Sequence, residues 1–155
     1  MRITGEHSLP APPSEAWAAL HDVAILRAAV PGCEDLEQTG PATYAGSARI
    51  GIAVIKGLYR GTVSLSEEQP LESLCVAVDA RSGHGRISGQ GYLTLEPKEG
   101  GTILRYTGDV HVHGPLAAVG QRLLPSASKS LTEQFFQNFE RALGESKAGA
   151  PRGGF

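Results

Sequence analysis

A change in the period of the apolar residues at Gly114 constrains the fold of this chain more than any other feature. From Cys33 to His113 apolar and polar residues alternate, as in TILRYTGDVHVH. This two-residue period is typical of an antiparallel sheet with one face covered and the other in water. After Gly114 apolar residues recur every three or four positions as far as Leu143, which predicts a long helix. The apolar face of this helix needs a partner, and the covered face of the sheet can provide it.

The N-terminal part predicts a strand followed by two short helices. RITGEHSLP alternates weakly and ends at Pro10, which indicates a first strand. Pro13 suits the first turn of one helix, and Asp22 can cap a second helix that Pro31 and Gly32 end. We therefore expect an α+β fold. A curved seven-stranded antiparallel sheet wraps around a long C-terminal helix, with two short helices between strands 1 and 2.

Two features modify the expected C-terminal helix, which starts near Pro115. Pro125 removes one backbone hydrogen bond and predicts a kink near Gln121–Leu124. The segment 144–155 is small, polar and glycine-rich, and we expect it to be a flexible tail. The sequence thus predicts one ligand-binding domain over 1–143.

Length and charge exclude several classes of protein. A chain of 155 residues fits a single domain. The net charge is −2 and no run of basic residues stands out, so we expect no nucleic-acid partner. No apolar run is long enough to span a membrane, and none follows a basic N-terminus. These observations predict a cytoplasmic protein.

We expect an apolar cavity between the helix and the sheet. Gly89, Gly91 and Gly108 lie on the inner face and add no side chain, although strand glycines also mark bulges. Strand alternation and helical spacing assign the residues that line this cavity: Leu26, Val30, Tyr59, Ile87, Tyr106, Val110, Leu116, Val119, Leu123, Leu124, Ala127 and Leu131.

The expected cavity contains no acid–base pair and no activated nucleophile, which predicts that the protein is not an enzyme. The hydroxyls of Tyr59 and Tyr106 are its plausible polar groups. They either bind the carbonyls of a quinone-like ring or belong to core aromatics that reach water at an edge.

The two cysteines favour a structural interpretation. Cys33 and Cys75 are far apart and form no CxxC motif, which indicates two reduced thiols. A nucleophilic Cys33 needs a base beside it, and nothing in the sequence fixes His7 or His21 there. We expect Cys33 to be a small, inert residue at a bend.

The remaining histidines indicate neither a metal site nor a phosphate loop. His111 and His113 have a spacing that binds a metal when a third ligand arrives, but alternation places both on the polar face. His84 falls at a turn within GHGRISGQG, which leads into a strand rather than the helix that a phosphate loop requires. We expect no metal site.

Several strings resemble the carbon monoxide dehydrogenase CoxG family of the START-like, or SRPBCC, superfamily, which implies a helix-grip fold. The resemblance covers the chain from Met1 to about Leu143. The strings that carry it are LPAPPSEAWAAL (Leu9–Leu20), VPGCEDLE (Val30–Glu37), GHGRISGQGYLTLEP (Gly83–Pro97) and EQFFQNFERAL (Glu133–Leu143).

This resemblance implies an accessory protein of molybdenum hydroxylases such as carbon monoxide dehydrogenase. It implies a cavity for a lipophilic ligand, a quinone or lipid, and recruitment of the enzyme to the inner face of the membrane. It implies no resident cofactor beyond such a ligand. Many members end in an apolar, membrane-associating extension, whereas a polar segment follows Leu143 here, which weakens the case for direct anchoring.

Two other functions share this fold. One is a small enzyme of the polyketide cyclase type, and the other is a chaperone-like binder of a second protein. A charged acid–base group inside the cavity would favour the enzyme.

Overall fold

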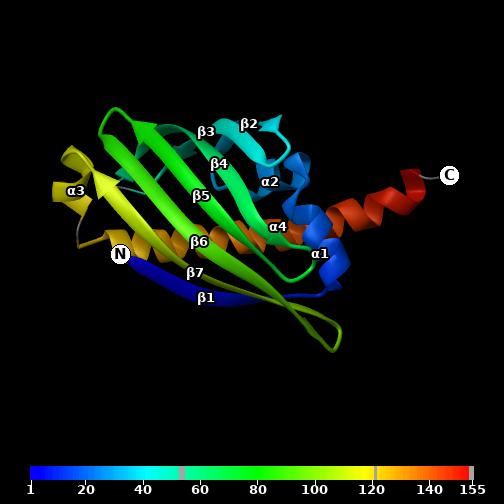
Figure 1. The fold of residues 1–155 in the computed structure, drawn as a ribbon. Coiled ribbons are helices and arrows are strands. Elements are labelled where there is room, and N and C mark those ends of the chain that lie inside the picture. The colour runs from blue at the N-terminus through cyan, green and yellow to red at the C-terminus, as the bar shows by residue number, and fades with distance from the viewer. Residues whose placement is uncertain (53–54, 121, 154–155) are drawn as a thin grey trace.

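The computed structural model describes the backbone of residues 1–52, 55–120 and 122–153, and the side chains of 1–52, 55–118 and 122–146. Figure 1 shows one curved sheet and one long helix. The strands are β1 (Arg2–Leu9), β2 (Cys33–Gly40), β3 (Thr43–Ile50), β4 (Gly57–Gln69), β5 (Ser73–Ser82), β6 (Gly85–Lys98) and β7 (Gly101–His113). The helices are α1 (Pro13–Leu20), α2 (Val23–Ala29), α3 (Pro115–Gly120) and α4 (Leu124–Gly153).

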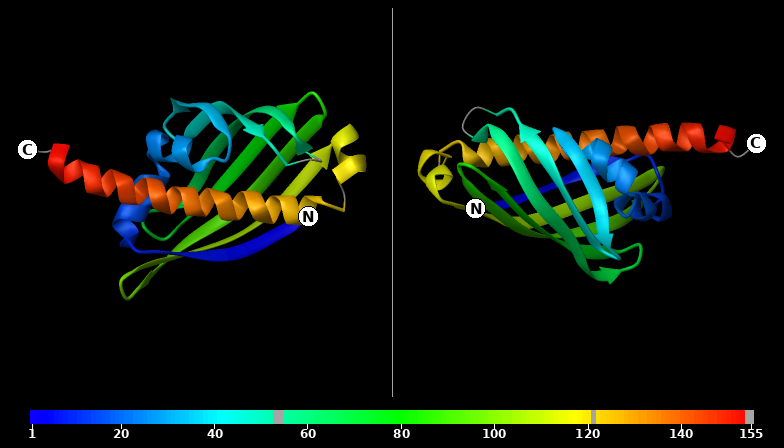
Figure 2. Two further views of the ribbon diagram at one scale, coloured as in Figure 1. Left: turned by 180° about the vertical axis from the view of Figure 1, so that it is seen from behind. Right: turned by 90° about the horizontal axis from the view of Figure 1, so that it is seen from above.

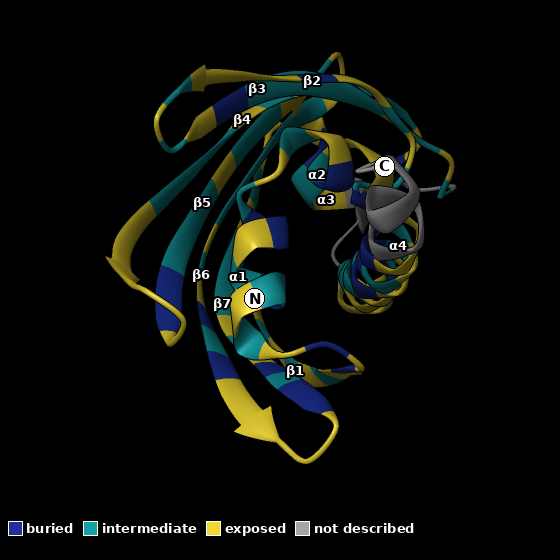
Figure 3. Cartoon of the chain, turned by 90° about the vertical axis from the view of Figure 1, so that its right-hand side faces the viewer, coloured by how far each residue is buried: buried dark blue, intermediate teal, exposed yellow. Residues whose placement is uncertain are grey.

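The sheet has seven strands in the order β1-β7-β6-β5-β4-β3-β2, and every neighbouring pair is antiparallel. Helix α4 crosses its concave face, with α1 and α2 beside it (Figure 2). Seen from one end, the sheet curves around the helices (Figure 3). The predicted helix-grip fold is therefore confirmed.

The register confirms which residues share the inner face. Leu93 lies opposite Tyr106, Gly91 opposite Gly108, and Gly89 opposite Val110. Because side chains alternate along a strand, these residues all point toward α4. The intervening residues, such as Gln90 and Asp109, form the outer face of the sheet.

The junction before β2 depends on one glycine. Asp22 caps α2 by accepting hydrogen bonds from the backbone nitrogens of Ala24 at 2.9 Å and Ile25 at 3.4 Å. At the other end of α2, Gly32 has φ +69°, and a Cβ there would lie 2.0 Å from the carbonyl oxygen of Arg49. Only glycine fits both the backbone angle and this close approach.

The C-terminal helix differs from the prediction in two ways. It does not run unbroken from Pro115, because α3 ends at Gly120 and α4 begins at Leu124. Pro125 lies in the first turn of α4, where its missing N–H leaves no helical hydrogen bond unmade, so it starts a helix rather than kinking one.

Helix α4 also continues to Gly153, so the prediction that the helix ends near Leu143 is wrong. The segment after Gly144 includes Glu145, Lys147 and Ala148, which favour helix, as well as Gly149 and Pro151, which disfavour it. Whether this segment is flexible stays a prediction. No helix within the described part of the chain is long and apolar enough to cross a membrane.

Candidate functional site

One apolar cluster fills the interior near α3. Its buried members come from the β3–β4 loop, β4, α3 and the start of α4, and half-buried residues of the sheet and α4 pack against them. Six of the predicted cavity residues meet in this cluster: Tyr59, Ile87, Leu116, Leu124, Ala127 and Leu131. It is called the α3 cluster below.

A second, larger apolar cluster lies at the other end of the interior. Phe136 and Phe139 of α4 are buried there against sheet residues such as Leu93 and Leu104. Tyr106 packs on its edge, with its ring 4.9 Å from that of Phe136 and nearly parallel to it. It is called the phenylalanine cluster. Tyr106, which packs against it, is one of the predicted cavity residues.

The inner face between these clusters is incompletely covered. A Cβ built on Gly89 would meet only the Asp109 carbonyl oxygen at 3.5 Å and a Val110 methyl at 3.8 Å among the described atoms. Both belong to β7, so no described atom of α4 lies within contact distance at this point. Val78, the β5 partner of Gly89, is 39% exposed although it lies on the inner face.

Gly91 and Gly108 extend this strip. The atoms nearest to a Cβ on either glycine belong to the neighbouring strand, not to α4. The name glycine strip is used below for Gly89, Gly91, Gly108, Val78 and Val110. Because an apolar surface this close to a core is normally covered, the glycine strip is the candidate ligand-binding site.

The structure does not place every predicted residue in this interior. Leu123 is 49% exposed and belongs to neither cluster, because it precedes the first turn of α4, so its placement in the cavity is wrong. Leu26 and Val30 are half-buried at α2 and also belong to neither cluster. The side chain of Val119 lies outside the described residues.

The hydroxyls of the two tyrosines have different neighbours. The Tyr59 hydroxyl is buried and donates a 2.7 Å hydrogen bond to the backbone oxygen of Ile55. Tyr59 is therefore a residue of the core. The Tyr106 hydroxyl lies beside Gly5, where an added Cβ would approach within 2.3 Å. Burial is the main cause that raises the pKa of both groups, so both stay protonated at neutral pH.

An ionisable pair that the sequence analysis missed lies on the inner side of β1. His7 Nε2 is 2.8 Å from Glu140 Oε1 of α4, and the His7 ring stacks on Phe136 at 5.8 Å. Alternation with Gly5 and Leu9 places His7 inward and could have revealed it. Its partner depends on the rotation of α4 about its axis, which the sequence does not specify.

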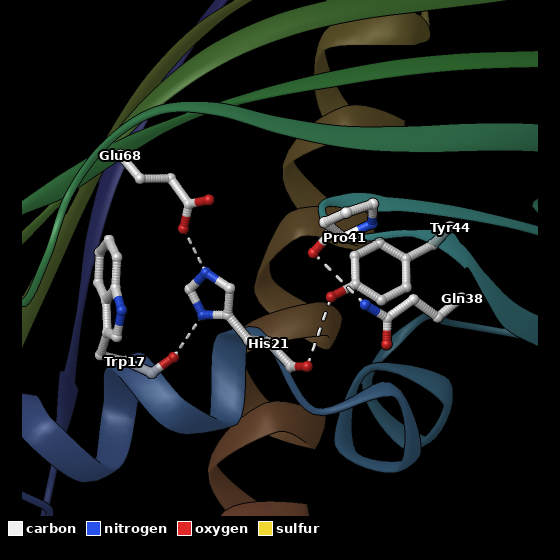
Figure 4. Close-up of polar contacts among 6 residues, drawn as sticks. All are labelled: Trp17, His21, Gln38, Pro41, Tyr44 and Glu68. Carbon is white, nitrogen blue, oxygen red and sulfur yellow. Dashed lines mark hydrogen bonds and ion pairs between the residues drawn. The ribbon is translucent and has the colours of Figure 1, made fainter.

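His21 forms a second polar network (Figure 4). Its Nδ1 lies 2.7 Å from the Trp17 carbonyl oxygen, and its Nε2 contacts the Glu68 carboxylate. Both partners accept hydrogen bonds, so His21 satisfies both only when each ring nitrogen carries a proton. The Tyr44 hydroxyl donates to the His21 carbonyl oxygen at 3.4 Å. His21 thus links α1 to β3 and β4.

The cysteines show no sign of activation. Cys33 Sγ donates to the Asp35 carbonyl oxygen at 3.4 Å. Burial and then the charge of Asp35 raise the pKa of the Cys33 thiol, which disfavours the nucleophilic thiolate. Both thiols are free. Within the described residues, no three His, Cys, Asp or Glu side chains converge as a metal site.

Comparison with known proteins places this geometry in a family. The family model for CoxG, a subunit of carbon monoxide dehydrogenase, matches residues 5–144. A conserved protein from Geobacillus kaustophilus has a similar crystal structure, with 31% identity and a TM-score of 0.88. The match covers 94% of this chain and 97% of that one.

More distant structures share the fold alone. A protein from Rhizobium leguminosarum is 19% identical, with a TM-score of 0.68 over 94% of this chain and 95% of that one. Ara h 8.0201 is 13% identical, with a TM-score of 0.64 over 94% and 98%. None of the curated proteins matches this chain.

Proposed function

The chain belongs to the carbon monoxide dehydrogenase CoxG family, and from this premise we propose that it is a non-catalytic accessory protein that carries an apolar ligand. The ligand class that we propose is a quinone or a lipid. The enzyme that it serves is a molybdenum hydroxylase of the carbon monoxide dehydrogenase type. It acts in the cytoplasm and recruits that enzyme to the inner face of the membrane.

The glycine strip is the observation that carries this proposal. It exposes backbone and valine side chains between two apolar clusters, and α4 places no described atom on Gly89. A flat ring can lie against glycine backbone at van der Waals distance, where side chains would hold it away. The clusters on both sides supply apolar walls, as binding sites for lipophilic molecules usually do.

Apolar contact alone supplies enough affinity for a carrier. Burying about 400 Å² of apolar ligand surface yields about 10 kcal/mol at roughly 25 cal/mol per Å². Ordering of the ligand and side chains opposes part of this gain. The remainder is compatible with a dissociation constant of about 1 μM, which corresponds to about 8 kcal/mol. Binding therefore needs no charged contact.

Native mass spectrometry of the protein released from its expression host tests the ligand class. We expect a co-purified quinone or lipid, bound one to one. Gly89→Leu would place a side chain where the ligand lies, and its Cβ meets atoms only at ordinary contact distance. This variant should fold and lose the ligand, at least about tenfold in affinity.

The matched control is Gln90→Leu, which adds the same side chain at the next residue of β6 but on the exposed outer face. It should keep the ligand. Equal ligand occupancy in Gly89→Leu and Gln90→Leu would refute the interior site. A polar metabolite bound in place of a lipophilic molecule would refute the ligand class.

A further inference from the structure

Three arginines that are separated in the sequence lie side by side on the outer face of the sheet. Arg60 of β4 is directly opposite Arg81 of β5, and Arg81 is directly opposite Arg86 of β6. Arg86 is in turn opposite His113 of β7. These four residues, called the arginine row below, lie near α3 and alternate with inward-facing residues such as Tyr59 and Ile87.

This arrangement is electrostatically unfavourable for the isolated protein. Side chains directly opposite each other on antiparallel strands are about 5 Å apart at Cβ, and like charges there destabilise a sheet. Asp79 relieves part of the repulsion, because Arg86 donates to its two carboxylate oxygens at 2.9 and 2.6 Å. Arg60 and Arg81 form no ion pair with any residue that the structure describes.

The lowered pKa of Asp79 is consistent with this concentration of positive charge. Its pKa is lowered first by the hydrogen bond from Arg86 and then by the charges of Arg86, Arg81 and His113. Three guanidinium groups less one carboxylate leave two positive charges in the arginine row, before His113 is counted. The whole chain carries −2, so this row is not part of a generally basic surface.

Hydroxyl groups lie next to the arginine row. Thr62 and Ser88 are the cross-strand partners of Asp79 on either side. With Asp79 and His111, they line part of a hollow of about 740 Å³ on the outer face. A group held by the arginines would therefore find hydroxyl donors on the side toward the middle of the sheet.

We propose that the arginine row binds a phosphate-type oxyanion, with the hydroxyls of Thr62 and Ser88 at its edge. A phosphate group carries about −1.5 to −2 charge, which matches the two uncompensated positive charges. The planar guanidinium fork suits oxyanions with two or more oxygens, and charge-assisted bonds to it are strong. The arginine side chains lie on the outer face of the sheet, whereas the glycine strip is assigned to the inner face, although Val78, Gly89, Gly91 and Gly108 also line the hollow beside the arginine row.

Two sources can present such a group: a soluble phosphate compound and the headgroup of an anionic phospholipid. Pyrophosphate titration by calorimetry, at constant ionic strength, tests the first. Co-sedimentation with phosphatidylcholine vesicles, with and without phosphatidylglycerol, tests the second. We expect saturable binding in at least one of these experiments.

The variant Arg60→Gln/Arg81→Gln should weaken that binding by about tenfold or more, because each lost group removes charge-assisted hydrogen bonds. The control Lys98→Gln/Arg141→Gln removes the same charge from exposed positions elsewhere and should leave binding within about twofold, because screened distant charges contribute little. Binding of pyrophosphate alone identifies a soluble ligand, and binding of anionic vesicles alone identifies a lipid headgroup. Both results support the site.

Urea unfolding is a second measurement, made first without and then with pyrophosphate. At low salt Arg81→Gln should unfold at a higher urea concentration than the wild type, since it removes repulsion. Pyrophosphate should raise the midpoint of the wild type and leave that of Arg60→Gln/Arg81→Gln unchanged. If the double glutamine variant does not fold, Arg60→Lys/Arg81→Lys takes its place in the binding experiments, because it keeps the charge and loses the guanidinium fork. The proposal would be overturned if the wild type bound neither pyrophosphate nor anionic vesicles. It would also be overturned if the double variant of Arg60 and Arg81 bound as well as the control variant of Lys98 and Arg141.

Discussion

His7 Nε2 and Glu140 Oε1 lie 2.8 Å apart and join the edge strand β1 to helix α4 across the interior. The two side chains are 22% and 42% exposed, so the contact is partly screened by water. The His7 ring also stacks on Phe136. The pair therefore fastens the helix beside the phenylalanine cluster through both polar and aromatic contact.

We expect His7→Ala to lower the free energy of unfolding by about 1–2 kcal/mol, because it removes the stacked ring as well as the polar contact. Glu140→Gln keeps the packing and should cost about 0.5 kcal/mol or less, as partly exposed ion pairs contribute little. Urea unfolding measures both. Equal losses in the two variants would show that the polar contact, not the ring, dominates.

The same pair distinguishes a carrier from an enzyme. His7 and Glu140 are an ionisable pair near the interior, and an enzyme of the polyketide cyclase type would need such a group. If the protein is a carrier, His7→Gln should leave ligand occupancy in native mass spectra within about twofold, because apolar contact supplies the affinity. Chemical conversion of a ligand that disappears in His7→Gln would contradict the carrier function.

Gly32→Ala should be the most damaging small substitution near α2. The position combines φ +69° with a Cβ that would lie 2.0 Å from the Arg49 carbonyl oxygen. We expect a loss of about 2–4 kcal/mol, from strain in a left-handed backbone and from displacement of β3. Thermal unfolding measures it. Gly144→Ala in α4 is the control. Its added Cβ would meet no described atom within 4 Å beyond its own stretch of helix, and the variant should be more stable by up to about 1 kcal/mol.

The sequence predicted the sheet and its faces well because their signal is local. Alternation within each strand alone decides which residues point inward, and the register confirms Gly89, Gly91 and Gly108 on one face. The start of α4 was predicted less well. Pro125 disrupts a helix in its interior and suits one in its first turn, and the apolar spacing on both sides fits either arrangement.

The arginine row shows what a pattern of neighbouring residues cannot reveal. Arg60 and Arg81 are on different strands, so no run of basic residues marks them in the sequence. Their adjacency depends on the register between β4 and β5, which is set by turn lengths and by the bulge between Ser66 and Gln69. A one-residue slip would have moved either arginine to the inner face.

Stability at high pH should depend on the buried tyrosines. Burial raises the pKa of Tyr44, Tyr59 and Tyr106 above the ordinary value of 10.0. The folded protein then holds these protons more tightly than the unfolded chain does. The stabilisation is complete below pH 10 and is lost as the pH rises through the folded pKa values. The urea concentration at the midpoint of unfolding should therefore decrease as the pH is raised above 10.

Tyr59→Phe tests this origin at one residue. It removes the buried hydroxyl and leaves the Ile55 carbonyl oxygen without this donor, so we expect a loss of about 1–2 kcal/mol at neutral pH. The fall in stability above pH 10 should become shallower, since one titrating group is gone. An unchanged alkaline slope would assign the effect to the other tyrosines.

Cys33→Ser separates a structural thiol from a reactive one. Burial and the charge of Asp35 raise the pKa of this thiol, so the thiolate is scarce at neutral pH. We expect Cys33 to react with iodoacetamide more slowly than a free cysteine. Cys33→Ser should keep full ligand occupancy, at a cost in stability of about 1 kcal/mol from a polar hydroxyl in a half-buried position. Cys75→Ser is the matched control at the other free thiol. A turnover that Cys33→Ser abolishes and Cys75→Ser retains would make Cys33 a nucleophile and the protein an enzyme.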